Sequence, residues 1–282
     1  MRPVNHPISD QVVDDICDTA DRAARAAGDI QLAHFGKKNK FHQVGRHDVK
    51  LEVDQLCEAA IVKTIAGSFP HHAIVTEESG GHQNESEYLW IVDPLDGSVN
   101  FWRGIPYFGS CVACYFTGAA GDHTRIASPA GRRSVGSPIV GVVYTPLMDE
   151  LFIGVAGRGA TCNSEAIAAN GERKLGDAVI GLSFGSNKPA MQRMQRLCNQ
   201  LVRRVRKVRI LGSTALDMVN IANGKLSALL QSGVKIWDFA AARVVLEEGG
   251  GIFEAQETSA NQWDILASAP GLYASLKSIA FD

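Results

Sequence analysis

Four acidic residues stand beside predicted strands or helices, and their spacing suggests a shared site. Asp93 and Asp96 lie in the segment DPLDGSVNF, directly after the apolar run YLWIV. Glu77 follows a second apolar run, AIVT, and Asp238 begins a helix-like stretch after a tryptophan. Carboxylates that are crowded together repel one another, so such a site must bind a cation or raise a pKa. Oxygen donors without a nearby His or Cys favour Mg²⁺, with Mn²⁺ as the next best fit.

The residues that follow Asp96 suit a phosphate. Gly97 allows a close backbone turn, and Ser98 begins a predicted short helical turn whose free N–H groups can hold an anion. We assign the same phosphate- or substrate-binding role to Gly212, Ser213 and Thr214. Cations beside an anion cradle predict phosphoryl chemistry.

Each acidic motif also has a simpler explanation when it is taken alone. An isolated D-P-x-D is usually a capped turn, and Glu77 with Glu78 could form a solvated turn. Asp238 could act only as a helix N-cap, which stabilises a helix by about 1 kcal/mol. The co-occurrence of all these motifs in one chain favours a functional site.

Composition restricts the class of protein. The chain has 282 residues, of which 45% are hydrophobic, so it can fill a large core. Its formal net charge of −2 gives no general attraction to nucleic acid or to anionic membranes. The basic run RRVRKVR, 203–209, has no interleaved aromatic residues and spans a predicted helix end and strand start, which favours a solvated face over a nucleic-acid surface.

The cysteines and the N-terminus predict a cytoplasmic protein. The six cysteines are scattered through a chain too large to need disulfides, so we expect free thiols. Cys111 and Cys114 lie on a predicted strand, where their odd spacing sends the side chains to opposite faces and favours packing over zinc binding. The start of the chain does not resemble a signal peptide. The longest charge-free stretch, 104–121, is interrupted by Gly, Pro, Ser and Tyr, so we expect no membrane segment.

The first half of the chain predicts helices beside a largely antiparallel sheet. Apolar residues recur at helical spacing after a cap at Ser9 or Asp10, as far as Gly36, and a second helix follows Asp54. Strands are expected at AIVT, YLWIV, CVACYF, IVGVVY and ELFIGVAG. The segment 117–138 has no periodicity and predicts a long exposed hairpin loop.

The second half predicts an α/β layer with substantial parallel pairing, because strands alternate with helices from residue 178 onward. The expected strands are AVIGLSF, KVRIL and LSALLQ, and the expected helices span 191–205, 215–222 and 237–248. We place a domain boundary near Gly176. An α+β domain, 1–176, then carries most metal ligands, and an α/β domain, 177–282, supplies Asp238 and part of the substrate pocket.

Three motifs in this order resemble the signatures of the inositol monophosphatase family of Mg²⁺-dependent, lithium-sensitive phosphatases. They are VTEESG, 75–80, WIVDPLDGSVNF, 90–101, and WDFAAARVVLEEGGGIF, 237–253. Compatible elements lie between them over nearly the whole chain. The resemblance implies a five-layered α-β-α-β-α sandwich of the sugar-phosphatase type, commonly dimeric, and therefore a homodimer.

The resemblance also implies a role for each acidic residue. Glu77, Asp93 and the carbonyl of Leu95 would bind one metal ion. Asp93, Asp96 and Asp238 would bind a second, and a looser third ion would share Glu77. Ser98 stands where the family often has Thr, and its hydroxyl would orient the attacking water with support from Asp54.

The chain departs from the family pattern in two places. A Thr usually precedes the position of Asp54 by a few residues, whereas this chain reads DVKLEVD, with Lys50, Leu51 and Val53. Seven residues before Asp238, where animal inositol phosphatases place a Glu that contacts the sugar, this chain has Gln231. Gln231 belongs to the substrate site on this interpretation, although it could instead finish a strand and face solvent.

The function that these patterns predict is hydrolysis of a small phosphate monoester by metal-activated water. Inositol monophosphate is the leading substrate, and fructose 1,6-bisphosphate, histidinol phosphate and a nucleoside 3′,5′-bisphosphate are the alternatives. The partner is then a small phosphorylated metabolite, with no nucleic acid and no membrane. The alternative from another class is a non-catalytic protein that binds metal or nucleic acid, which the complete set of acids disfavours.

Overall fold

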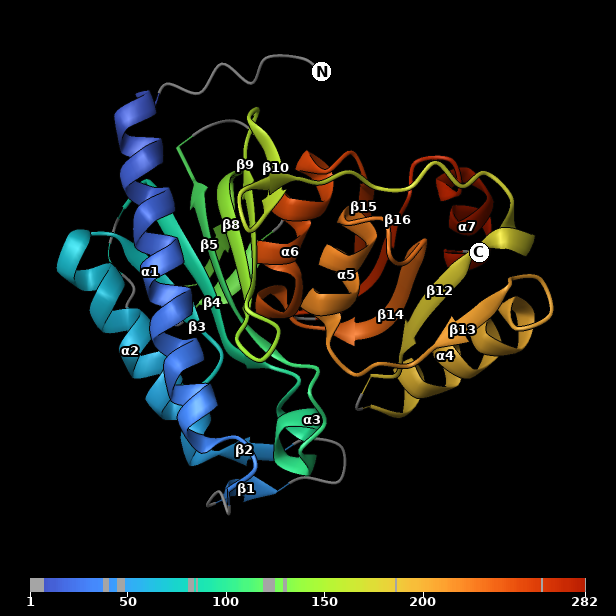
Figure 1. Cartoon of the computed structure of the whole chain (residues 1–282), viewed down its shortest axis with the longest axis horizontal. Coiled ribbons are helices and arrows are strands. Elements are labelled where there is room, and N and C mark those ends of the chain that lie inside the picture. Colours follow the sequence, from blue (N-terminus) through green and yellow to red (C-terminus); the bar gives the residue numbers. More distant parts are fainter. Residues whose placement is uncertain are drawn as a thin grey trace.

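The structure is a computed structural model that describes residues 8–37, 41–44, 49–80, 84, 86–118, 125–128, 131–185, 187–259 and 261–281, with only the backbone at 41–44, 49, 125–128 and 131–134. Its elements form five layers (Figure 1). Helices α1 (Asp10–His34) and α2 (Glu52–Ser68) form one outer layer. A first sheet, the central helices, a second sheet and two further helices follow. The predicted α-β-α-β-α sandwich is confirmed.

In the described part of the chain, seven strands form the first sheet in the order β11-β10-β9-β8-β5-β4-β3. Among these pairs, β3 and β4 are parallel and the others are antiparallel, as predicted. The strands are β3 (Ala73–Thr76), β4 (Tyr88–Asp96), β5 (Gly109–Phe116), β8 (Ser137–Thr145), β9 (Glu150–Val155), β10 (Gly159–Cys162) and β11 (Glu165–Ala166).

The second sheet has the order β13-β12-β14-β16-β15 among the described residues. Strand β12 pairs in parallel with both of its neighbours, β13 and β14, which confirms the predicted parallel pairing, and β16 is antiparallel to both of its neighbours. The strands are β12 (Val179–Ser183), β13 (Lys207–Arg209), β14 (Ala228–Val234), β15 (Ile252–Ser259) and β16 (Gln262–Ser268). Strands β15 and β16 were not predicted from the sequence.

Helices α5 (Thr214–Ala222) and α6 (Ile236–Glu248) lie between the sheets, whereas α4 (Lys188–Leu201) and α7 (Tyr273–Ala280) cover the far face of the second sheet (Figure 1). A short 3₁₀ turn, η1 (Leu175–Asp177), precedes β12. Helix α4 begins three residues before the predicted start, because Asn187 caps it by accepting a hydrogen bond of 2.9 Å from the amide of Ala190.

Two small hairpins lie outside the main sheets. β1 (Phe41–Val44) pairs with β2 (Val49–Leu51) just before α2. β6 (Arg125–Ser128) pairs with β7 (Gly131–Ser134) within the segment that the sequence predicts as a long hairpin loop. The pairing agrees with that prediction, and the rest of the loop lies partly outside the described residues.

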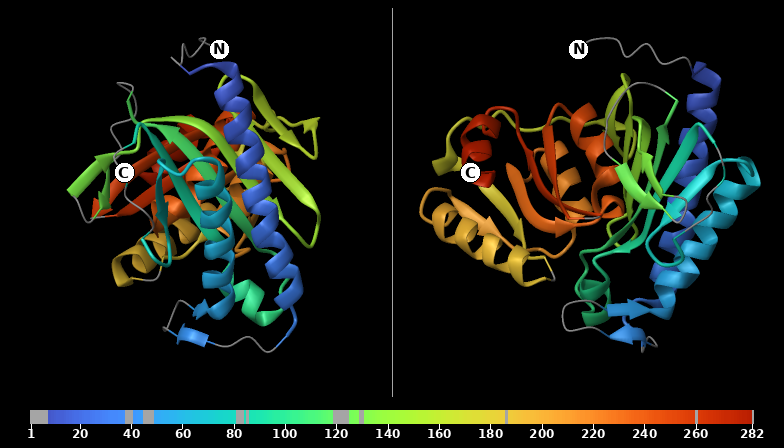
Figure 2. Two further views of the ribbon diagram at one scale, coloured as in Figure 1. Left: turned by 90° about the vertical axis from the view of Figure 1, so that its left-hand side faces the viewer. Right: turned by 180° about the vertical axis from the view of Figure 1, so that it is seen from behind.

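Three hydrophobic clusters hold the layers together. One lies between the first sheet and the outer helices α1 and α2, which cross its outer face (Figure 2). The largest surrounds α5 and α6 and reaches both sheets, and the third lies between the second sheet, α4 and α7. Cys111 belongs to the central cluster and Cys114 to the outer one, so the two thiols do point to opposite faces of β5.

Two glycines allow α6 to approach the first sheet closely. A Cβ atom on Gly141 of β8 would lie 2.2 Å from the carbonyl oxygen of Ala241, and one on Gly154 of β9 would lie 2.7 Å from Cα of Val245. These distances are too short for any side chain. This close contact sets the distance between α6 and the first sheet. The first turn of α6 carries Asp238.

The predicted domain boundary near Gly176 falls in the connection between the last strand of the first sheet and the first strand of the second. Because α5 and α6 come from the second half and pack on both sheets, the two halves share the central hydrophobic cluster. The division into two domains stays a prediction. None of the helices in the described ranges is both long and apolar enough to cross a membrane.

Candidate active site

The four predicted acidic residues line a single cleft with a volume of about 380 Å³. Glu77 directly follows β3, and Asp93 and Asp96 lie in β4. Because β3 and β4 are parallel and Thr76 is opposite Val92, the next residues, Glu77 and Asp93, leave the pair at the same level. Asp238 approaches from the first turn of α6. The fold therefore brings together four carboxylates from three elements.

A bulge in β4 explains how Asp93 and Asp96 both reach the cleft. Both residues were predicted to follow the strand, but β4 continues through Asp96. Asp93 is opposite Cys111 and Asp96 is opposite Gly109, so three steps on β4 match two steps on β5. Residues three apart on a regular strand face opposite sides, and the extra residue of a bulge removes that difference.

Asp93 is a buried acid whose charge is disfavoured by its surroundings. Its side chain is 2% exposed, and its Oδ1 accepts a hydrogen bond of 3.1 Å from the amide of Leu95. Burial raises its pKa well above the usual range, and the charges of Glu77, Asp96 and Asp238 raise the pKa further. A bound cation would stabilise the ionised form of a carboxylate in this position.

Asp96 is held by the N-terminus of α5. Its Oδ2 accepts hydrogen bonds from the amide of Ala215, at 2.8 Å, and from the hydroxyl of Ser213. Burial raises the pKa of Asp96, and these hydrogen bonds oppose the rise. Ser213 itself is buried and does not line the cleft. The hydroxyl of Ser213 thus contacts Asp96, and the predicted substrate contact of Ser213 stays a prediction.

Asp238 combines a place in the cleft with helix capping. Its Oδ2 accepts a hydrogen bond of 2.8 Å from the amide of Lys235, at the start of α6. Its second role as a metal ligand remains a prediction.

Asp54 lies differently from the other predicted residues: it is buried in the first turn of α2, accepts a hydrogen bond from the amide of Leu51 and does not line the cleft. Helix α2 begins at Glu52, before the predicted start at Asp54.

The turn after Asp96 lies where the sequence predicts a phosphate site. Gly97 has a φ of +89°, and a Cβ atom there would lie 2.9 Å from the carbonyl oxygen of Tyr107. Ser98 begins α3 (Ser98–Arg103) and donates a hydrogen bond of 3.1 Å to the carbonyl oxygen of Leu95. Leu95, Gly97 and Ser98 all line the cleft.

The second half of the chain forms the opposite wall. Gly212, Thr214 and Gln231 line the cleft, and Oε1 of Gln231 accepts a hydrogen bond of 2.9 Å from the hydroxyl of Thr214. Gln231 lies inside β14 and not at its end. The alternative that Gln231 merely finishes a strand is therefore wrong, and its role in substrate binding stays a prediction.

Sequence reasoning missed several residues of the cleft. Lys50, Val99, Phe184, Gly185, Gly233, Val234, Lys235 and Trp237 also line it. Lys50 lies in the segment before α2 where the chain departs from the family pattern. That departure was the sequence signal that could have identified Lys50 as a residue of the cleft. The two lysines offset part of the negative charge of the four carboxylates.

The donor set suits a hard divalent cation, because four carboxylate side chains line the cleft and no Cys or His is present among the described residues that line it. Among the described residues, no three His, Cys, Asp or Glu side chains already stand in a geometry that would hold an ion. One oxygen each of Asp93, Asp96 and Asp238 is engaged by a backbone amide. The assignment of individual ligands therefore remains a prediction.

Comparison with known proteins identifies the family. A sequence model of the inositol monophosphatase family matches residues 13–120 and 134–279. The chain is 32% identical to inositol monophosphatase 2 of Solanum lycopersicum, over 90% of this chain and 92% of the relative. It is 31% identical to Nus factor SuhB of Pasteurella multocida, over 88% and 89% of the two chains.

Solved structures agree with these matches. The inositol monophosphatase of Anabaena superposes with a TM-score of 0.73 at 29% identity, and the superposition covers 95% of this chain and 96% of the other. The chain therefore belongs to the inositol monophosphatase family, a family of phosphatases, as its three motifs predict.

Proposed function

We propose that this protein is a Mg²⁺-dependent phosphatase that hydrolyses a small phosphate monoester, with inositol monophosphate as the leading substrate. The observation that carries the proposal is the convergence of Glu77, Asp93, Asp96 and Asp238 on one cleft. Uncatalysed hydrolysis of phosphate monoesters is among the slowest known reactions, so dense electrostatic stabilisation is useful here.

On this proposal the acidic residues bind the metal ions, and the turn after β4 orients the attacking water. Glu77, Asp93 and the carbonyl of Leu95 would hold one Mg²⁺, and Asp93, Asp96 and Asp238 a second. Bound Mg²⁺ supplies Lewis-acid activation of water and of the phosphoryl oxygens. The hydroxyl of Ser98 donates to the carbonyl of Leu95, so its oxygen is left to accept a hydrogen bond from the attacking water.

Gln231 and Thr214 give the opposite wall a neutral hydrogen-bonding surface. An amide both donates and accepts, whereas a carboxylate only accepts, so this wall suits hydroxyl groups of a polyol. The wall also tolerates a second phosphate better than a carboxylate would, which keeps fructose 1,6-bisphosphate and nucleoside 3′,5′-bisphosphates as alternatives. Histidinol phosphate, a monophosphate, is the third alternative.

The test is phosphate release from these four substrates at saturating Mg²⁺, with an excess of EDTA as the control. We expect metal-dependent release, fastest from one substrate of the panel. Absence of metal-dependent release from all four would reject the proposal.

A second candidate is a non-catalytic binding role, because similar relatives are named Nus factor SuhB. The basic run 203–209 is its candidate surface, and within it Arg206 pairs with Asp177 at 2.7 Å. This partial neutralisation favours the phosphatase. A gel-shift assay with a salt titration separates the two roles, and we expect no binding of RNA or DNA at physiological salt.

We further propose a cytoplasmic homodimer, which follows from the family resemblance and the free cysteines. Light scattering coupled to size-exclusion chromatography measures the mass directly, and a mass of one chain would contradict the dimer.

A further inference from the structure

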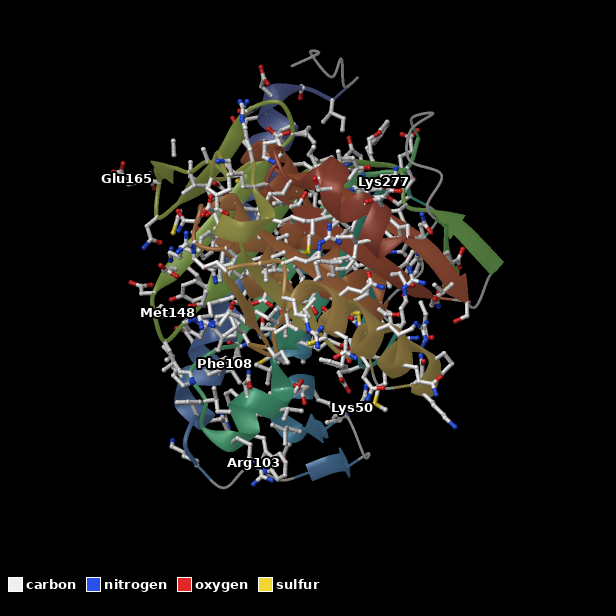
Figure 3. All side chains as sticks on the ribbon, turned by 90° about the vertical axis from the view of Figure 1, so that its right-hand side faces the viewer. Lys50, Arg103, Phe108, Met148, Glu165 and Lys277 are labelled. Carbon is white, nitrogen blue, oxygen red and sulfur yellow. The ribbon has the colours of Figure 1, made fainter. Side chains whose placement is uncertain are left out.

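Lys50 places a positive charge at the wall of the acidic cleft. It lies on β2, which packs beside α3, and it lines the cleft with the four carboxylates. Figure 3 shows Lys50 at the lower end of the molecule, near the β1–β2 hairpin and α3. Its side chain is 26% exposed, so the ammonium is partly shielded from water without being buried.

The ammonium group is held in place by Glu78. Nζ of Lys50 lies 2.9 Å from Oε1 of Glu78, whose side chain is 7% exposed. Glu78 is the residue after Glu77, so the ion pair ties Lys50 to the turn that carries one of the predicted metal ligands. An ammonium that is fixed by a shielded partner loses less conformational freedom when it binds a second anion.

The turn beside Lys50 is itself rigidly anchored. The buried carboxylate of Glu58, on α2, accepts hydrogen bonds from the amides of Glu78 and Ser79 at 2.8 and 3.0 Å. Lys50 is therefore not required to hold the backbone of this turn, because Glu58 already does so. The ion pair with Glu78 instead holds the ammonium at the wall of the acidic cleft.

We infer that Lys50 is a phosphate-binding residue of this chain: its ammonium contacts the phosphoryl group of the substrate at the Glu77 side of the cleft. This inference rests on the proposed function, because it assumes a phosphorylated substrate. Lysine binds phosphate as a point charge, and Lys50 supplies that charge where the chain lacks the usual Thr before α2. The ammonium shares its charge between Glu78 and the phosphate.

The test compares two affinities of the Lys50→Met variant, both measured by calorimetry. The first is the affinity of the Mg²⁺-loaded protein for inorganic phosphate, which we expect to fall about tenfold, as for loss of a charge-assisted hydrogen bond. The second is the affinity for Mg²⁺ in phosphate-free buffer. It should be unchanged or higher, because a positive charge has left an acidic cleft.

The two affinities together separate a phosphate contact from a structural contact, because only a phosphate contact lowers the phosphate affinity without lowering the Mg²⁺ affinity. A residue that merely supports the turn of Glu77 would lower both affinities when it is removed. Unchanged phosphate affinity, or a parallel loss of Mg²⁺ affinity, would overturn the inference. Lys50→Arg should keep most of the phosphate affinity, and Lys50→Gln serves as a second neutral variant if Lys50→Met does not fold.

Two further variants serve as controls. Glu78→Gln removes the ion pair and keeps the ammonium, so phosphate affinity should fall less than it does in Lys50→Met. An equal loss in Glu78→Gln and Lys50→Met would show that Lys50 acts only through Glu78 and would overturn the inference. Lys63→Met makes the same charge change on an exposed part of α2 outside the cleft and should change neither affinity.

The inference and the proposed function can fail separately. If the wild-type protein releases no phosphate from any ester but Lys50→Met still weakens phosphate binding, the proposed function fails and the phosphate contact stands. If the wild type is an active phosphatase and Lys50→Met binds phosphate normally, the inference fails and the function stands.

Discussion

The amide of Ala215 donates a hydrogen bond of 2.8 Å to Oδ2 of Asp96, and this bond joins the N-terminus of α5 to the carboxylate at the end of β4. Ser213 adds a second hydrogen bond to the same oxygen. The N-terminus of a helix favours a negative charge, so α5 helps to keep Asp96 ionised despite its burial. The position of a predicted metal ligand in the first sheet thus depends on a helix from the other half of the chain.

Ser213→Ala should weaken Mg²⁺ binding about tenfold, because residues that orient a metal ligand typically contribute that much to affinity. The substitution also removes the N-cap of α5, since the hydroxyl of Ser213 accepts a hydrogen bond from the amide of Leu216, at a cost of about 1 kcal/mol. Calorimetric titration with Mg²⁺ measures the first effect. Ser213→Thr keeps the hydroxyl and should restore binding; equal weakening in both variants would count against the positioning role.

Ser98→Ala should lower kcat about a hundredfold with little change in KM, because the hydroxyl is proposed to orient water and not to bind substrate. The measurement is steady-state phosphate release at saturating Mg²⁺. Ser98→Thr, which keeps the hydroxyl, is the matched control. An effect confined to KM would instead identify Ser98 as a phosphate contact.

Gln231→Glu should shift selectivity toward inositol monophosphate and away from fructose 1,6-bisphosphate by about five- to tenfold, the effect of one like-charge contact near a protein surface. The new carboxylate can still accept the hydrogen bond from Thr214, so the fold should tolerate it. The ratio of the two kcat/KM values is compared with that of the wild type and of Gln55→Glu on the exposed face of α2. An unchanged ratio would remove Gln231 from the substrate site.

His72 should make the fold less stable in mild acid. Its ring stacks on Phe69 and Tyr88, with ring centroids 4.5 Å apart in each case, and its Nδ1 accepts a hydrogen bond of 3.1 Å from Nε1 of Trp90. Burial, with a smaller contribution from His71, lowers its pKa from 6.5 to about 4. The folded state then binds fewer protons than the unfolded state between these pH values.

The stability that depends on neutral His72 is therefore complete above pH 6.5 and is lost as the pH falls toward 4. Because the ring is only half-buried, we expect the loss to be about 1 kcal/mol. Urea unfolding at several pH values measures it in the wild type and in His72→Phe, which keeps the stacking but cannot titrate. Identical pH profiles for the two proteins would show that His72 does not contribute.

The layers of the fold could be predicted largely from local patterns. Helix α1 follows from its apolar periodicity and from Ser9, which does cap it. The strands before Glu77 and Asp93 follow from short apolar runs that end at acids. The paired strands β15 and β16 were missed because much of β15 is polar and partly exposed, so it lacks an apolar run.

The site residues that could be predicted from the sequence lie in recognisable motifs. The residues that were missed reach the site only through tertiary contacts. Asp93 and Asp96 were identified by their spacing, but the bulge that turns both to the cleft arises from pairing with β5. Lys50 is a single residue in a short strand, and no local pattern shows that β2 folds against the cleft. Ser213 was expected to bind substrate, yet its hydroxyl contacts Asp96, 117 residues away in the chain.

The central claim is tested most directly by Asp93→Asn, measured as Mg²⁺-dependent phosphate release from inositol monophosphate and the three alternative substrates. Asparagine keeps the shape and the hydrogen bond from Leu95 but removes the charge that would bridge two metal ions. We expect the wild type and Asp29→Asn, an exposed control on α1, to release phosphate, and Asp93→Asn to be folded and inactive. Retention of most of the wild-type kcat by folded Asp93→Asn would contradict the account.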